Sequence, residues 1–258
     1  MLFTGEELST MVGGYFWPFV RIAAMISAMP VFSSNFIPVK VRLILAIALT
    51  LIIAPVIPPV PAVDAISIQG FLIILQQLLV GVSMGFIFHM VFAAFTIGGQ
   101  IIAMQMGLGF STMVDPVNGS QTPVLSMFYI LLVTLLFFIL NGHLVMIGVV
   151  AKSFTTLPIA TSGIEAQNFW DIVVWGKNMF IGAVLVALPA ITALLFVNMS
   201  LGMIGRAAPQ LNIFAVGFSI TIVAGFFVIM MSMSVVVSQF EVIALEAFNL
   251  IKAIPGVE

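Results

Sequence analysis

The stretch 66–114 contains no Asp, Glu, Lys or Arg, and it runs into the glycine-spaced sequence Gly107-Leu108-Gly109-Phe110. A membrane-spanning helix needs about 20 apolar residues, so this uncharged stretch is too long for one span. It must hold a full span followed by a second, irregular piece. Irregular backbone within a sequence apolar enough to lie in a membrane is expected where the chain lines or blocks a pore or cavity.

The whole chain has the composition of an integral membrane protein. Of its 258 residues, 62% are hydrophobic and 6% are charged, and the mean hydropathy is +1.31. Soluble domains carry about 25% charged residues. Because no polar block is long enough to form a soluble domain, the sequence predicts a single membrane-embedded domain over residues 1–258.

Apolar segments near spanning length predict an all-α, multi-helix membrane bundle with about six hydrophobic segments. The region 153–177 is the most polar part of the interior sequence and indicates an interfacial loop or a short amphipathic helix. Near residues 106–122 we expect a broken helix. The apolar segments cover residues 11–32, 41–57, 71–97, 123–140, 179–201 and 211–237.

Charge and residue types exclude several functions. Seven basic and nine acidic residues leave no basic patch for nucleic acid. The absence of cysteine excludes disulfides, thiolate catalysis and cysteine-ligated metals. The sequence also has no Ser-His-Asp spacing and no glycine-rich phosphate loop ending in Lys-Ser or Lys-Thr. We therefore expect no enzyme, no cofactor and no metal.

Some polar side chains stand in apolar surroundings. Arg21 lies within the first apolar segment, where an arginine costs about 2.5 to 3.5 kcal/mol on insertion scales. It either extends to an interface or pairs with a carboxylate or with backbone carbonyls in a helix bundle. Arg206 has a similar context, and we expect both arginines to bond subunit interfaces rather than substrate. Gln100, Gln105 and His143 complete the subunit-interface or buried-polar candidates.

Two further groups bear on an alternative function. His89 could act as a proton relay, but no carboxylate lies within a few helical turns, which favours a core histidine. Asp115 could be a coupling-ion carboxylate, although Asp followed by Pro116 is also ordinary turn sequence. The alternative function is therefore a proton-coupled secondary transporter of a small solute that uses these two groups.

A series of short motifs occurs in order along nearly the whole chain, and the series resembles the FliR family of flagellar biosynthesis proteins. That family is the flagellar counterpart of the export-gate T subunit of virulence type III secretion systems. The motifs are Tyr15-Phe16-Trp17-Pro18 with Arg21, Ile37-Pro38 with Arg42, Ala54-Pro55, Gln76-Gln77, Gln105-Met106-Gly107-Leu108, Asp115-Pro116, Pro123-Val124-Leu125, Asn141-Gly142-His143, Leu157-Pro158-Ile159, Ala187-Leu188-Pro189 and Arg206-Ala207-Ala208-Pro209-Gln210.

The resemblance implies a non-enzymatic core subunit of the flagellar type III protein export gate, in the bacterial inner membrane at the flagellar basal body. One copy would assemble with several FliP and FliQ subunits around a pore, with FlhB attached and with other export-apparatus proteins and membrane lipids as neighbours. Unfolded flagellar proteins would pass through the pore. The hydrophobic bundle would be raised largely out of the membrane plane, toward the periplasmic side.

The resemblance also implies that the loop after Gln105 fills the pore as a plug. Burying one Phe, Leu or Met contributes about 1.5 to 3 kcal/mol, so a few apolar residues would give a tight but reversible seal. Two glycines would supply the necessary backbone freedom. The plug residues would be Met106, Gly107, Leu108, Gly109, Phe110, Met113, Val114, Asp115 and Pro116.

Overall fold

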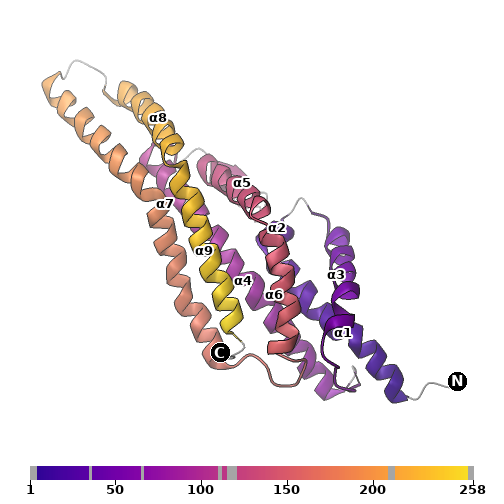
Figure 1. The fold of residues 1–258 in the computed structure, drawn as a ribbon. Helices are drawn as coiled ribbons and strands as arrows, with labels where there is room; N and C mark the ends of the chain where they lie inside the picture. Colours follow the sequence, from indigo (N-terminus) through magenta and orange to yellow (C-terminus); the bar gives the residue numbers. More distant parts are fainter. Residues whose placement is uncertain are drawn as a thin grey trace. The chain divides into compact units, whose positions relative to one another are not determined.

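The computed structural model describes residues 5–34, 37–64, 67–109, 112–114, 121–208 and 213–254. Most of these residues are helical (Figure 1). The elements are α1 (Gly5–Ala28), α2 (Pro30–Ser33), α3 (Val39–Ile53), η1 (Ala54–Val56), α4 (Ile68–Gln105), β1 (Thr112–Val114), β2 (Gln121–Pro123), α5 (Val124–Ile139), α6 (Gly142–Thr156), α7 (Ala166–Ala207), α8 (Ile213–Met231) and α9 (Met233–Ala253). The predicted helical class is confirmed, with two short strands added.

Several of the described helices can span a membrane. Four are long and apolar enough, namely Val39–Val56, α4, α7 and α9, and the bent pair formed by α5 and α6 makes five if it counts as one span. The sequence count of about six apolar segments is therefore approximate. The predicted end of the fourth segment at residue 140 coincides with the break between α5 and α6, where Asn141 has a φ of 56°.

The region 153–177, for which its polarity indicates an interfacial loop or a short amphipathic helix, contains a loop at 157–165 between two helices. Helix α6 continues to Thr156, and the long helix α7 begins at Ala166. The polar side chain of Asn168 serves this helix start, because its Oδ1 accepts the Glu165 N–H at 2.9 Å. Its Nδ2 also donates to the carbonyl of Ile254, just after α9, at 2.7 Å. The polar side chain of Asn168 thus bonds both the start of α7 and the end of α9.

Contacts divide the chain into two compact units, and each is assembled from segments distant in the sequence. The first contains Met1–Met90, Leu140–Trp175 and Leu245–Glu258, and the second contains Val91–Ile139 and Gly176–Ala244. Helices α4, α7 and α9 each contribute residues to both units.

In the first unit, glycines allow α4 to lie directly against α1. A Cβ on Gly81 would collide with the carbonyl oxygen of Arg21, and one on Gly85 would lie 2.6 Å from the Cβ of Ala28. These contacts advance along both helices together, so α1 and α4 run in the same direction. Small residues at such contacts are typical of helices that pack closely in membranes.

In the second unit, the last part of α4 forms the centre. Phe95 of α4 is fully buried and stacks edge to face on Phe240 of α9, with ring centroids 5.8 Å apart. A Cβ on Gly99 would come within 2.8 Å of the backbone of Ser126 in α5. The Ser126 hydroxyl donates in turn to the carbonyl of Thr96 at 3.0 Å. Helix α5 therefore packs closely on this part of α4.

The outer faces of the long helices are apolar. On α8, Val223 is 71% exposed, Phe227 60% and Met231 67%. Contiguous exposed apolar side chains of this kind mark surfaces that lipid or protein covers. The chain is a membrane-embedded helical protein.

Candidate functional site

Helix α4 ends in a glycine cap, and the predicted loop starts at this cap. The N–H of Leu108 donates to the carbonyl of Ala103 at 2.8 Å, and the N–H of Gly107 donates to the carbonyl of Met104 at 3.1 Å. Gly107 itself has a φ of 77°. This pair of bonds around a left-handed residue is the Schellman motif. Glycine occupies the left-handed position because a Cβ there is sterically penalised.

Helix α8 packs on the first two residues of the loop. Met106 is fully buried, and its side chain lies on the bare backbone of Gly225. A Cβ on Gly225 would lie 2.5 Å from Cγ of Met106 and 2.6 Å from both its Sδ and its Cε. The next residue, Gly107, faces the ring of Phe218. The loop base is therefore held by α8, whereas Leu108 and Gly109 are half-buried.

Beyond its base the loop forms a short antiparallel ladder. Thr112 pairs with Pro123, Met113 with Thr122 and Val114 with Gln121. The sequence predicts a broken helix in this region, and the break is real, but part of the loop is extended. Thr and Val favour extended backbone because they are β-branched. Three predicted plug residues, Phe110, Asp115 and Pro116, lie outside the described residues.

Most of the polar candidates reach the surface of the chain. Gln100 and Gln105 on α4 are exposed. Arg206 is also exposed and lies in the last turn of α7, where the helix dipole favours a cation. His143, near the start of α6, is half-buried. Gln100, Gln105 and Arg206 thus present their polar groups to whatever surrounds the chain.

Arg21 is different because it is fully buried within the first unit. Its Nε donates to Oε1 of Gln77 at 2.8 Å. Its Nη1 donates to the carbonyl and the hydroxyl of Ser153, at 2.8 and 3.0 Å, and its Nη2 donates to the carbonyl of Leu157 at 2.8 Å. Of the two environments considered for Arg21, extension to an interface or pairing inside a helix bundle, the structure has the pairing, with backbone carbonyls as partners.

The positive charge of Arg21 faces the end of a helix. The carbonyls of Ser153 and Leu157 stand at the C-terminal end of α6, where the helix dipole is negative. Cζ of Arg21 also lies 4.3 Å from the centre of the Phe154 ring, which favours a cation.

Sequence reasoning missed the contact of α8 with the loop base. Gly225 and Phe218 lie in an almost featureless apolar helix, and they are separated from Met106 by more than one hundred residues. The only signal was the glycine itself, because small residues occur where another segment approaches a membrane helix closely.

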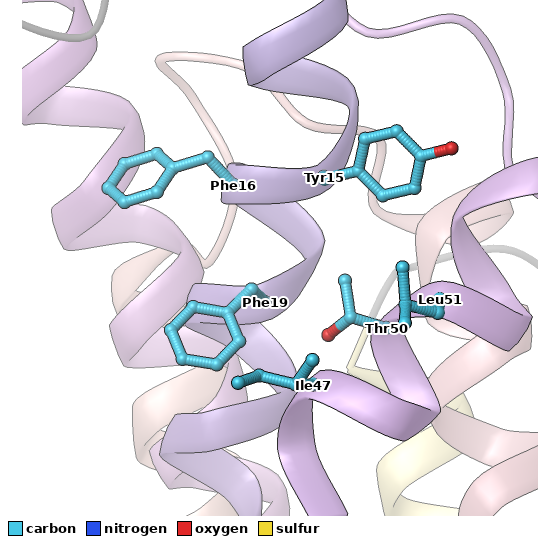
Figure 2. A pocket seen from close by; sticks show the side chains of 6 residues that line it. All are labelled: Tyr15, Phe16, Phe19, Ile47, Thr50 and Leu51. Carbon is cyan, nitrogen blue, oxygen red and sulfur yellow. The ribbon is translucent and has the colours of Figure 1, made fainter. Parts of the chain in front are cut away.

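A pocket of about 360 Å³ lies between α1 and α3 in the first unit (Figure 2). Figure 2 shows Tyr15, Phe16 and Phe19 on the α1 side, and Ile47, Thr50 and Leu51 come from α3. The Thr50 hydroxyl donates to the carbonyl of Ala46 within its own helix at 2.7 Å. The wall is thus almost entirely apolar, and it contains no predicted site residue.

These features define a helical membrane protein in which a long apolar helix ends in a glycine cap and continues into an anchored, non-helical loop. Comparison with known proteins gives a specific family. The chain belongs to the bacterial export proteins, family 1, whose sequence model matches residues 12–247.

Relatives match this chain over nearly the whole length of both proteins. The chain is 38% identical over 251 residues to the "Flagellar biosynthetic protein FliR" of Pectobacterium carotovorum subsp. carotovorum, with 97% of this chain and 96% of that protein covered. It is 37% identical over 248 residues to the protein of the same name from Escherichia coli (strain K12), at 96% and 95% coverage. For the Aquifex aeolicus (strain VF5) protein of that name the identity is 32% over 234 residues, at 90% and 89% coverage.

Proposed function

We propose that this chain is a core, non-enzymatic subunit of the flagellar type III protein export gate. Family membership and the full-length similarity to proteins named for flagellar biosynthesis support this function. The subunit would assemble with FliP, FliQ and FlhB and with other export-apparatus proteins, in the bacterial inner membrane at the flagellar basal body. Unfolded flagellar proteins would be its substrates.

Within that gate, residues 106–122 act as the plug. One observation carries this proposal. The regular helix ends at the Gly107 cap, within an uncharged sequence that is apolar enough for a membrane, and an extended two-stranded ladder follows. Non-helical backbone at membrane depth is tolerated where protein buries it or where it lines a water-filled cavity. An apolar loop that occupies a pore satisfies the first condition when the gate is closed and the second when it is open.

The remaining candidates have structural roles in this proposal. Gln100, Gln105, His143 and Arg206 contact neighbouring subunits, whereas Arg21 holds helices of its own chain together. The two compact units work as one export-gate domain, because α4, α7 and α9 each supply residues to both.

The test is an ion-leak measurement on cells that contain the complete gate. Deleting residues 108–114 should raise the conductance of the membrane. A second variant of unchanged length, with Leu108, Phe110, Met113 and Val114 replaced by Asn, should also leak, because a polar loop attracts water. The control is Val56→Asn, since Val56 is 80% exposed and lies outside the loop. Copurification of the partner subunits reports assembly in every case.

Unchanged conductance in an assembled gate that lacks residues 108–114 contradicts the plug. The alternative, a proton-coupled transporter of a small solute, predicts uptake by the isolated chain in vesicles. The family to which the chain belongs gives that alternative no support. A gate subunit is expected to be inactive without its partners.

A further inference from the structure

We propose that Gly225 is a positioning residue for the plug loop: its missing side chain forms the seat on α8 into which Met106 locks the loop base. This inference rests on the proposed function of residues 106–122 and identifies what holds them in the closed position. Gly225 touches neither substrate nor pore in this proposal, and it acts through Met106.

The seat is a close fit. Met106 has no exposed surface, and three atoms of its side chain lie within 2.6 Å of the point where a Cβ on Gly225 would stand. Real Cβ atoms do not approach other heavy atoms to this distance, so one additional methyl group on α8 would displace Met106. No other residue type at position 225 leaves the space that Met106 fills.

Displacement of Met106 would reach the loop directly. Met106 is the last residue before Gly107, where the chain turns with a positive φ. The bonds from Gly107 to Met104 and from Leu108 to Ala103 fix the direction in which the loop leaves the helix. The neighbouring contact of Gly107 with the Phe218 ring belongs to the same helix, α8. Helix α8 therefore holds the loop base at two consecutive residues.

Methionine is suited to a contact that must open. Its side chain is unbranched and has three rotatable bonds, so it can leave and re-enter a tight seat. A β-branched side chain is restricted at χ1 and could not leave the seat in this way. The seat thus explains how an apolar loop is held firmly at rest and still released during export.

The experiment compares glycine-to-alanine variants in the complete gate. Gly225→Ala should raise ion conductance several-fold over the unsubstituted protein, with partner subunits still copurifying. The control is Gly202→Ala in α7, which also places alanine in a helix but whose new Cβ has no atom of the described residues within 4 Å apart from its chain neighbours and the nearby backbone of its own helix. Both substitutions improve helix propensity equally, so a difference between them reports the seat.

A second substitution tests the seat from the other side. Met106→Ala should also leak, because nothing then occupies the seat. In the double variant Met106→Ala with Gly225→Ala, the new methyl group has room, and the leak should fall below that of Gly225→Ala alone. A general weakening of the fold would make the two effects add instead.

The outcomes separate this inference from the function on which it rests. If the variant lacking residues 108–114 leaks while assembled Gly225→Ala behaves like Gly202→Ala, the seat is wrong and the plug stands. If neither leaks, both are wrong. Should Gly225→Ala fail to assemble, Met106→Ala decides the matter: an assembled Met106→Ala gate without a leak overturns the seat.

Discussion

Nε of Arg21 in α1 donates a 2.8 Å hydrogen bond to Oε1 of Gln77 in α4, and both side chains are almost fully buried. The same guanidinium binds the carbonyls of Ser153 and Leu157, so one side chain connects three segments of the first unit. A buried cation is costly unless its donors are satisfied. Here a side-chain amide, a hydroxyl and two carbonyls satisfy donors on all three of its nitrogen atoms.

Removing this guanidinium should destabilise the subunit. Arg21→Met keeps an apolar chain of similar length but removes the donors to Gln77 Oε1 and to the Leu157 carbonyl, at about 1 to 3 kcal/mol for each unpaired group, whereas the Ser153 carbonyl keeps the N–H of Leu157. Arg21→Lys keeps the charge but cannot reproduce the planar fork, so it should also destabilise the subunit. The measurement is the melting temperature of the purified gate. Lys152→Met is the control, because Lys152 is an exposed residue of α6, and an equal melting temperature for Arg21→Met and this control contradicts the prediction.

The close approach of α1 and α4 gives a second prediction. Gly81→Ala places a Cβ against the carbonyl oxygen of Arg21, which is backbone and cannot move aside easily. Overpacking of this kind costs about 1 to 3 kcal/mol. Gly148→Ala is the matched control, since in the described part of the chain only its chain neighbours and the nearby backbone of its own helix approach the new Cβ within 4 Å. We expect less intact gate to copurify with Gly81→Ala than with Gly148→Ala, and equal yields contradict the packing argument.

Asn168 makes two hydrogen bonds that one substitution can separate. In Asn168→Asp the carboxylate still accepts the Glu165 N–H, so the start of α7 should persist, but the donor to the Ile254 carbonyl is lost. That loss should cost about 1 kcal/mol. In hydrogen exchange, amides near the end of α9 should therefore exchange faster, while those of the first turn of α7 should not. Faster exchange at both ends contradicts this assignment.

The sequence predicts the class of this fold well because long uncharged apolar segments have few alternatives to membrane helices. It predicts some breaks and misses others. The predicted segment 123–140 ends just before Asn141, whose φ of 56° is a conformation that asparagine tolerates, but the predicted segment 211–237 runs through the break between α8 and α9. The partners of Arg21 were also out of reach, because Ser153 is 132 residues away in the chain. For long-range contacts between apolar residues, such as Met106 with Gly225, a single sequence shows a small residue but does not identify the segment that approaches it.

The two glycines at the start of the loop should differ in their tolerance of alanine. Gly107 has a φ of 77°, where an L-residue costs about 1 to 2 kcal/mol, and a Cβ there would also lie 3.2 Å from the Phe218 ring. Among the described residues, the nearest atoms to a Cβ on Gly109 belong to Met104, with Cγ at 3.3 Å and Cα at 3.7 Å. Gly107→Ala should therefore disturb the helix cap and raise ion conductance of the assembled gate more than Gly109→Ala.

Gly107→Asn should leak less than Gly107→Ala, because asparagine tolerates the left-handed conformation. Equal conductance for the Gly107 and Gly109 alanine variants means that the cap does not set the position of the loop.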